Sequence, residues 1–214
     1  MATVAASSSL PAPPRSALHF PTSFAQLPLR VRPAAWVSDD ELFELCQINR
    51  DLKIERTAEG EIIVMAPTGG ATGNRNFKLT VAFGQWVAKD GTGLGFDSST
   101  GFILPNGAQR GPDAAWVKRE RWEALTAQQR ERFPPLAPDF VIELRSPSET
   151  LDELKSKLAE YIANGVELGW LIDPFARAVH VYRPGEVPQV LRDVDRVSGE
   201  PLLPGFVLDL SAIW

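Results

Sequence analysis

The sequence predicts an α/β fold in which short strands alternate with amphipathic helices. Three observations predict it. Apolar runs such as residues 62–66 have the length of strands, and residues 151–163 carry apolar side chains at helical spacing. A glycine-containing turn at residues 58–60 separates two apolar segments, as in a β-hairpin. No apolar run approaches the roughly 18 residues that a membrane helix needs, so we expect no membrane contact.

The composition fits a single globular domain. The chain has 214 residues, of which 44% are hydrophobic and 23% are charged. One cysteine, Cys46, excludes an internal disulfide framework and a cysteine-built metal site, and this usage fits the reducing cytoplasm. Two histidines are too few for a histidine-rich metal site. The net charge of −5 argues against a DNA-coating protein but leaves a nuclease open, because metal-binding carboxylates lower the net charge.

The N-terminal part differs in composition from the rest. Residues 1–37 contain no Asp or Glu and are rich in Ala, Ser and Pro, so we expect a flexible N-terminal arm. The folded domain is expected to span residues 38–214. It begins with a helix to about residue 49, because Ser38 and Glu41 have the spacing of a capping box. A hairpin of residues 52–56 and 61–65 should follow.

The remaining elements follow from periodicity and turn residues. Asp90 and Gly91 end a helix that we expect over residues 74–89. Two further helices are predicted, over 119–132 and 151–163. The predicted strands lie at residues 94–96, 101–104, 112–117, 139–145, 168–172, 178–182 and 206–208.

One carboxylate interrupts an otherwise apolar strand. Alternation in residues 139–145 places the apolar residues 140, 142 and 144 on one face and Glu143 with Arg145 on the other. A buried carboxylate needs a partner, and an ion pair with Arg145 or a lysine is one interpretation. The second is a metal site, because Asp113 opens another short strand directly after a proline. Two carboxylates from two strands suit Mg²⁺, which prefers oxygen ligands and water.

A lysine beside such a site would orient the attacking water and neutralise developing charge. A helical projection of residues 151–163 places Lys155 and Lys157 at the two edges of the apolar stripe. Either could reach a neighbouring sheet. Lys157 also has Glu153 four residues earlier, and a surface ion pair with Glu153 is the alternative interpretation.

A series of residues resembles the Uma-two family, which was first catalogued as a domain of unknown function. The family is classed with the restriction-endonuclease-like PD-(D/E)XK nucleases. The likeness runs from about Ser38 to Trp214. Its motifs are the hairpin, the Pro112–Asp113 pair, Asp139 to Ser148, Lys157, Tyr161, Gly165–Val166 and Trp170 to Pro174.

The resemblance implies a mixed sheet flanked by helices, with Asp113 as the motif aspartate and Glu143 as the second carboxylate. Arg145 stands where the standard motif has lysine, and arginine cannot act as a base but could clamp a phosphate oxygen. Lys157 matches a lysine that substitutes from the next helix. Glu55 matches an early acidic position and could complete the metal shell, although it also reads as an exposed strand residue.

Two further groups of residues each have two interpretations. Asn74 and Asn76 begin a helix where relatives carry histidine, but asparagine also caps helices. A basic run brackets Trp122 and could form a phosphate-binding ridge, although such a run is more often a solvated helix face. Its members are Lys118, Arg119, Arg121, Arg130 and Arg132.

The leading functional prediction is a Mg²⁺-dependent endonuclease, with Mn²⁺ as a substitute, that hydrolyses DNA phosphodiesters in the cytoplasm. A non-catalytic nucleic-acid-binding or regulatory module on the same fold is the alternative, and hydrolysis of another phosphoester is a third. A homodimer is an expectation by analogy with restriction-like enzymes only.

Overall fold

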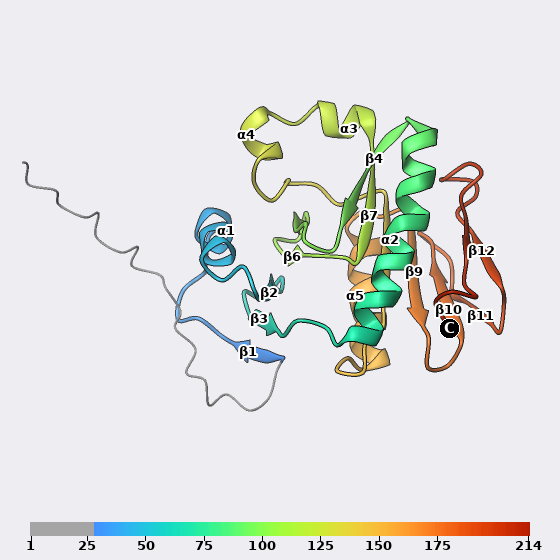
Figure 1. The fold of residues 1–214 in the computed structure, drawn as a ribbon. Coiled ribbons are helices and arrows are strands. Elements are labelled where there is room, and N and C mark those ends of the chain that lie inside the picture. Colours follow the sequence, from blue (N-terminus) through green and yellow to red (C-terminus); the bar gives the residue numbers. More distant parts are fainter. Residues whose placement is uncertain (1–27) are drawn as a thin grey trace, which may run out of the picture.

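The computed structural model describes residues 28–214 and contains a six-stranded mixed sheet at its centre (Figure 1). Strands β8 and β9 pair in parallel, and every other neighbouring pair in this sheet is antiparallel. The order across the sheet is β11-β10-β9-β8-β7-β4. The strands are β4 (Gly93–Asp97), β7 (Ala114–Lys118), β8 (Phe140–Leu144), β9 (Leu168–Asp173), β10 (Ala178–Tyr182) and β11 (Gln189–Arg192). The predicted α/β class with a mixed sheet is confirmed.

Two helices cover opposite faces of this sheet. Helix α2 (Gly70–Asp90) packs Leu79 and Phe83 against the face that carries Phe140 and Trp170. The other face is covered by α5 (Leu151–Ala163), whose buried residues Leu154, Leu158 and Tyr161 lie among Val141, Leu171 and other sheet residues. Helix α2 begins four residues earlier than predicted. Neither α2 nor any other helix within residues 28–214 is both long and apolar enough to cross a membrane.

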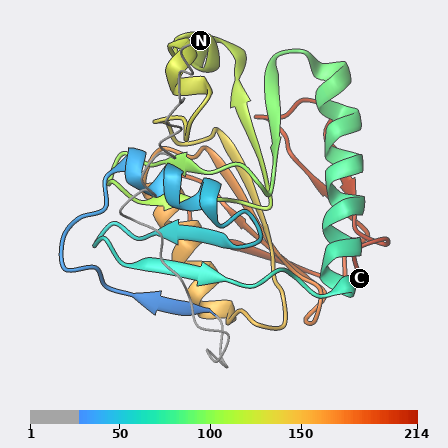
Figure 2. The same cartoon turned by 60° about the vertical axis from the view of Figure 1, so that its left-hand side comes forward.

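A second sheet lies beside the first and carries the predicted hairpin (Figure 2). Its order is β1-β3-β2-β6-β5. Gly60 turns the hairpin with a φ of +82°, a conformation that favours glycine. Helix α1 (Asp39–Ile48) packs Leu42 and Leu45 on this sheet, and Ser38 and Glu41 form the predicted capping box. The strands are β1 (Leu29–Val31), β2 (Lys53–Arg56), β3 (Ile62–Met65), β5 (Phe102–Ile103) and β6 (Gln109–Arg110).

The expected boundary of the N-terminal arm is wrong at its C-terminal end. Strand β1 lies within residues 28–37 and pairs antiparallel with β3, and Trp36 stacks under the Arg56 guanidinium at 4.4 Å from the ring centroid. The folded part therefore begins before residue 38. Residues 1–27 lie outside the described residues, so flexibility there stays a prediction.

The expected polar helix over residues 119–132 is two short helices instead. These are α3 (Arg119–Glu123) and α4 (Ala127–Arg130). Thr126 interrupts the helix because its side chain caps α4 in a capping box with Gln129. The chain ends with a small two-stranded sheet of β12 (Arg196–Ser198) and β13 (Val207–Asp209).

Candidate active site

The two predicted carboxylates lie side by side. Asp113 directly precedes β7, and its backbone N–H donates to the Ile142 carbonyl oxygen at 2.9 Å, next to Glu143. The Glu143 side chain leaves the sheet on the face that α5 covers, because its neighbour Ile142 belongs to the opposite face. The Asp113 Oδ2 atom accepts a hydrogen bond from the Leu144 backbone N–H at 2.7 Å, which fixes this carboxylate over β8.

Glu143 is buried and receives two donors from α5. The Lys157 Nζ atom lies 2.8 Å from Glu143 Oε1, and the Tyr161 hydroxyl donates to the same oxygen at 3.0 Å. Within residues 28–214, Glu143 Oε2 has no hydrogen-bond partner. It is not one of the fully buried polar atoms without a partner in that range, so a ligand can reach it. One oxygen of Glu143 is therefore free to accept a further ligand.

Glu55 on β2 joins the same cluster from the second sheet. Its Oε1 atom accepts from Lys157 Nζ at 2.9 Å and from the Gly111 backbone N–H at 3.1 Å. The Arg110 Nη1 atom donates to Glu55 Oε2 at 3.3 Å. Only 4% of the Glu55 side chain is exposed, so the interpretation of an exposed strand residue is wrong.

Of the two candidate lysines of α5, only Lys157 contacts the carboxylate cluster within residues 28–214. Lys157 reaches into the carboxylate cluster, whereas Lys155 pairs with the exposed Asp152. The alternative surface pair of Lys157 with Glu153 is wrong, because Glu153 binds Arg30.

The charges around the carboxylates separate their pKa values. Burial, reinforced by the nearby Asp113 and Glu55, raises the pKa of Glu143 to about 7, although Lys157 and Lys53 oppose the rise. Burial also disfavours the charged form of Glu55. There, however, the charges of Lys157, Lys53 and Arg110 outweigh it and lower the pKa to about 2. Burial acts against the charged form of Lys157, but the Glu143 and Glu55 carboxylates hold its pKa above the usual range.

The donor set suits a hard cation at Asp113 and Glu143. Among residues 28–214, the Asp113 Oδ1 atom has only weak partners, Asn76 Nδ2 at 3.4 Å and Lys53 Nζ at 3.9 Å. Beside it, Asn76 Oδ1 is buried without a hydrogen-bond donor, as expected where a metal-bound water would lie. Within residues 28–214, no three His, Cys, Asp or Glu side chains form a metal-binding group. Two carboxylates with waters and carbonyl oxygens match the preference of Mg²⁺.

Arg145 is not part of this cluster. Its Nη1 atom donates to Asp173 Oδ2 at 2.8 Å, and its Nε donates to the Glu149 carbonyl oxygen at 3.3 Å. Its guanidinium also lies over the exposed Phe175 ring. The structure therefore gives Arg145 a structural partner on β9 in place of the predicted catalytic contact, and the interpretation of a Glu143–Arg145 ion pair is wrong.

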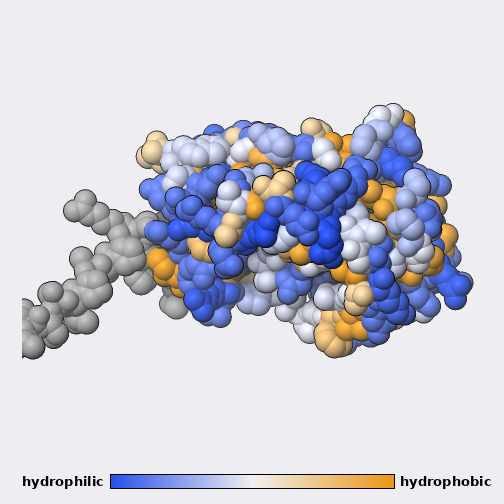
Figure 3. All heavy atoms as spheres, turned by 90° about the horizontal axis from the view of Figure 1, so that it is seen from above, coloured by the Kyte–Doolittle hydropathy of each residue, from blue (hydrophilic) through white to orange (hydrophobic). Residues whose placement is uncertain are grey.

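Most of the basic run around Trp122 is paired with carboxylates. Lys118 and Arg121 both pair with the buried Asp139, and Arg132 pairs with Asp40. The face that carries α3 and α4 is largely hydrophilic with small hydrophobic patches (Figure 3). These contacts favour a solvated, ion-paired face over a phosphate-binding ridge.

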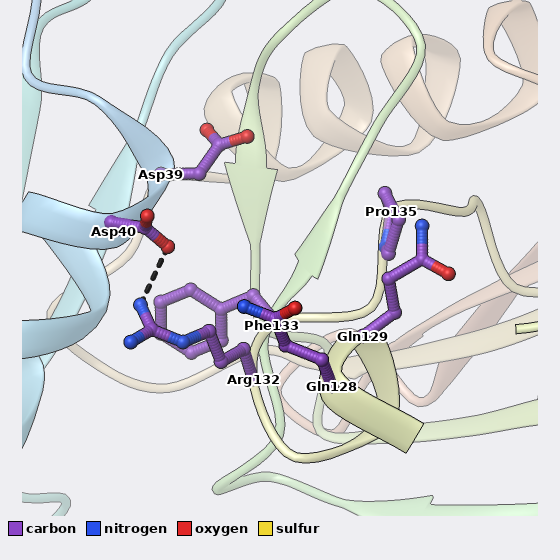
Figure 4. Close-up of a pocket in the computed structure, with 7 residues that line it drawn as sticks. All are labelled: Asp39, Asp40, Gln128, Gln129, Arg132, Phe133 and Pro135. Carbon is purple, nitrogen blue, oxygen red and sulfur yellow. Dashed lines mark hydrogen bonds and ion pairs between the residues drawn. The ribbon is translucent and has the colours of Figure 1, made fainter. Parts of the chain in front are cut away.

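A pocket of about 170 Å³ lies elsewhere, between α1 and α4 (Figure 4). It is lined by Asp39, Asp40, Gln128, Gln129, Arg132, Phe133 and Pro135. It contains none of the predicted site residues, and its acidic and basic side chains bind each other or neighbouring residues. We therefore place the candidate active site at the carboxylate cluster, because that is where titratable groups with shifted pKa values converge.

Sequence reasoning missed three members of the cluster. The helical spacing of residues 151–163 gives no sign that the Tyr161 hydroxyl contacts Glu143. Lys53 and Arg110 were not considered, although Arg110 stands three residues before Asp113. Their proximity depends on how the second sheet meets α5, which local patterns do not reveal.

Comparisons with known proteins agree with the fold. The crystal structure of "a putative nuclease belonging to DUF820" from Anabaena variabilis ATCC 29413 matches with a TM-score of 0.63 and 21% identity, over 75% of this chain and 88% of that one. This likeness shows the restriction-endonuclease-like fold. No curated protein matches the chain. The model of the Uma2 family, described as "Putative restriction endonuclease", matches residues 39–211. The chain therefore belongs to the Uma2 family.

Proposed function

We propose that this protein is a metal-dependent endonuclease that hydrolyses DNA phosphodiesters, with Mg²⁺ or Mn²⁺ held by Asp113 and Glu143. One observation carries the proposal: Asp113, directly before β7, lies beside Glu143 of β8, and the Lys157 ammonium group is 2.8 Å from Glu143 Oε1. The family description and the nuclease fold support the reaction class and a nucleic acid as substrate.

Each residue has a separate role in this proposal. When bound, the cation would polarise the phosphodiester and lower the pKa of a coordinated water. Asp113 offers Oδ1, and Glu143 offers Oε2, which has no other partner within residues 28–214. Lys157 acts as a donor of positive charge and hydrogen bonds toward the phosphate, not as a base, because its pKa lies above the usual range.

The direct test is cleavage of supercoiled plasmid by the purified full chain with Mg²⁺, Mn²⁺ or a chelator. Asp113→Asn and Glu143→Gln should each abolish nicking, since each removes a ligand charge while preserving shape. Asp152→Asn is the matched control, because this carboxylate is 93% exposed and lies outside the cluster. Nicking by Asp113→Asn at the rate of the unmodified protein would refute the assignment of Asp113 as a metal ligand.

A non-catalytic nucleic-acid-binding module is the second candidate. It is favoured by Arg145, which replaces the motif lysine and is bound to Asp173. Salt-dependent DNA binding that needs no metal, together with no cleavage under any metal condition, would support it.

A further inference from the structure

We propose that Glu55 is a positioning residue that orients Lys157, and that it does not bind the metal. This inference rests on the proposed function and refines it. It assigns the metal to Asp113 and Glu143 alone, and it gives the acidic residue of the hairpin a different task.

The oxygens of Glu55 are already occupied by donors. Oε1 accepts from the Lys157 ammonium and from the Gly111 backbone N–H, and Oε2 accepts from Arg110. The N–H of Gly111 is fixed by the backbone, and a bound cation would have to displace it together with a charged side chain. Glu143 differs, because its Oε2 has no such donor within residues 28–214.

The local charge also disfavours a cation at Glu55. Lys157, Arg110 and Lys53 all act on this carboxylate. A divalent ion placed there would be repelled by three positive groups within a region of low dielectric constant. Lys157 and Lys53 also act on Glu143, but there the neighbouring Asp113 adds a negative charge, so the site between these two carboxylates is the more favourable one for a cation.

Three ion pairs and one turn of α5 together form a ring that fixes Glu55 in place. Arg110 Nε donates to Glu160 Oε2 at 2.6 Å, and Glu160 lies three residues after Lys157 on the same helix. Asn106 donates to the other Glu160 oxygen at 3.0 Å. The ring therefore runs from Lys157 through Glu55 and Arg110 to Glu160, and it joins α5 to the second sheet.

The ring determines where the lysine points. An ammonium group has three N–H donors, and the carboxylates of Glu55 and Glu143 engage two directions around Lys157. The remaining donor is available for a phosphate oxygen. Without the charge of Glu55, the ammonium would be held from one side only, and its direction would no longer be set.

The test separates metal binding from catalysis with Glu55→Gln and Glu143→Gln. Calorimetric titration with Mn²⁺ alone should give Glu55→Gln a Kd within about threefold of the unmodified protein, whereas Glu143→Gln should lose at least about tenfold. Single-turnover cleavage by Glu55→Gln should be slower by roughly 10–100-fold. The protein concentration that gives the half-maximal cleavage rate should change little. Equal losses of Mn²⁺ affinity in the two variants would overturn the proposal.

A second measurement does not depend on metal or activity. Acylation of Lys157 by an amine-reactive ester, followed by mass spectrometry, should be about tenfold faster in Glu55→Gln than in the unmodified protein, because losing the adjacent Glu55 charge lowers the pKa of the Lys157 ammonium group. Lys155 provides the internal control, and circular dichroism checks folding. Unchanged acylation of Lys157 would overturn the positioning role. If the unmodified protein neither binds Mn²⁺ nor cuts DNA, the proposed function fails, while acylation still decides the role of Glu55.

Discussion

Replacing Lys157 with methionine deletes the ammonium group that lies between Glu55 and Glu143. Lys157 is 12% exposed, and the two carboxylate side chains are 4% and 2% exposed. Removing one partner of a buried ion pair costs about 3–5 kcal/mol, because the remaining charge stays buried without compensation. Methionine and lysine have similar helix propensities, so α5 itself should be unaffected.

Urea denaturation at pH 8 measures this loss. With a slope of about 2 kcal/mol per molar urea, the midpoint should fall by about 2 M. Lys155→Met is the matched control on the same helix. Lys155 is 40% exposed and its partner Asp152 is 93% exposed, so its ion pair contributes at most about 0.5 kcal/mol. Equal midpoints for the two variants would refute the reasoning that Lys157 is buried in a carboxylate cluster.

The loss in Lys157→Met should also depend on pH. Without the ammonium group, the folded-state pKa values of Glu55 and Glu143 rise. A carboxyl whose pKa is raised on folding binds a proton more tightly in the folded state, so the free energy of unfolding falls as pH rises from the unfolded pKa to the folded one. Lys157→Met should therefore be destabilised less at pH 6 than at pH 8. The opposite order would contradict the assigned charges.

Three further outcomes are expected. Gly169→Ala places a Cβ atom 2.7 Å from Leu158 Cδ1, so the free energy of unfolding in urea should fall by about 1–3 kcal/mol. In the control Gly84→Ala, the new Cβ atom meets no atom within 4 Å, so the free energy of unfolding should rise by up to about 1 kcal/mol. Equal effects of the two substitutions would contradict the packing of α5 on β9. Thr150→Ala removes the capping box of α5 and should lower the free energy of unfolding by about 0.5–2 kcal/mol in thermal melts. An unchanged melting temperature would contradict this cap. Glu143 has a pKa raised from about 4.5 to about 7, so Mn²⁺ binding between these pH values should release up to one proton; calorimetry in two buffers of different ionisation enthalpy would show it, and buffer-independent heats would argue against Glu143 as a ligand.

Local patterns were sufficient for the hairpin, for α5 and for most central strands. They failed where a partner far away in the sequence decides. Strand β1 forms within a proline-rich segment because β3 offers a free edge. Helix α2 extends back to Gly70 although its first residues have low helix propensity. The break at Thr126 is different, because the Thr126–Gln129 capping box was readable from the sequence.

The candidate site divides in the same way. Alternation along β8 and the proline before Asp113 located the two carboxylates, because a strand determines the face of each side chain. The projection of α5 left Lys155 and Lys157 equivalent, since both flank the buried stripe. Only the position of the second sheet distinguishes them: Glu55 is 102 residues from Lys157 in sequence, and no local pattern encodes that contact.

The departure from the family motif has a physical explanation in the neighbouring strand. Parallel pairing places Glu143 opposite Leu171, so two residues further Arg145 lies beside Asp173, whose side chain is 1% exposed. Two buried carboxylates thus stand one strand apart, and each needs a cation. Were Arg145 to turn toward Glu143, Asp173 would be left buried without a positive partner. A lysine from α5 satisfies Glu143 without that cost, which is why an arginine at position 145 is compatible with a lysine-dependent site.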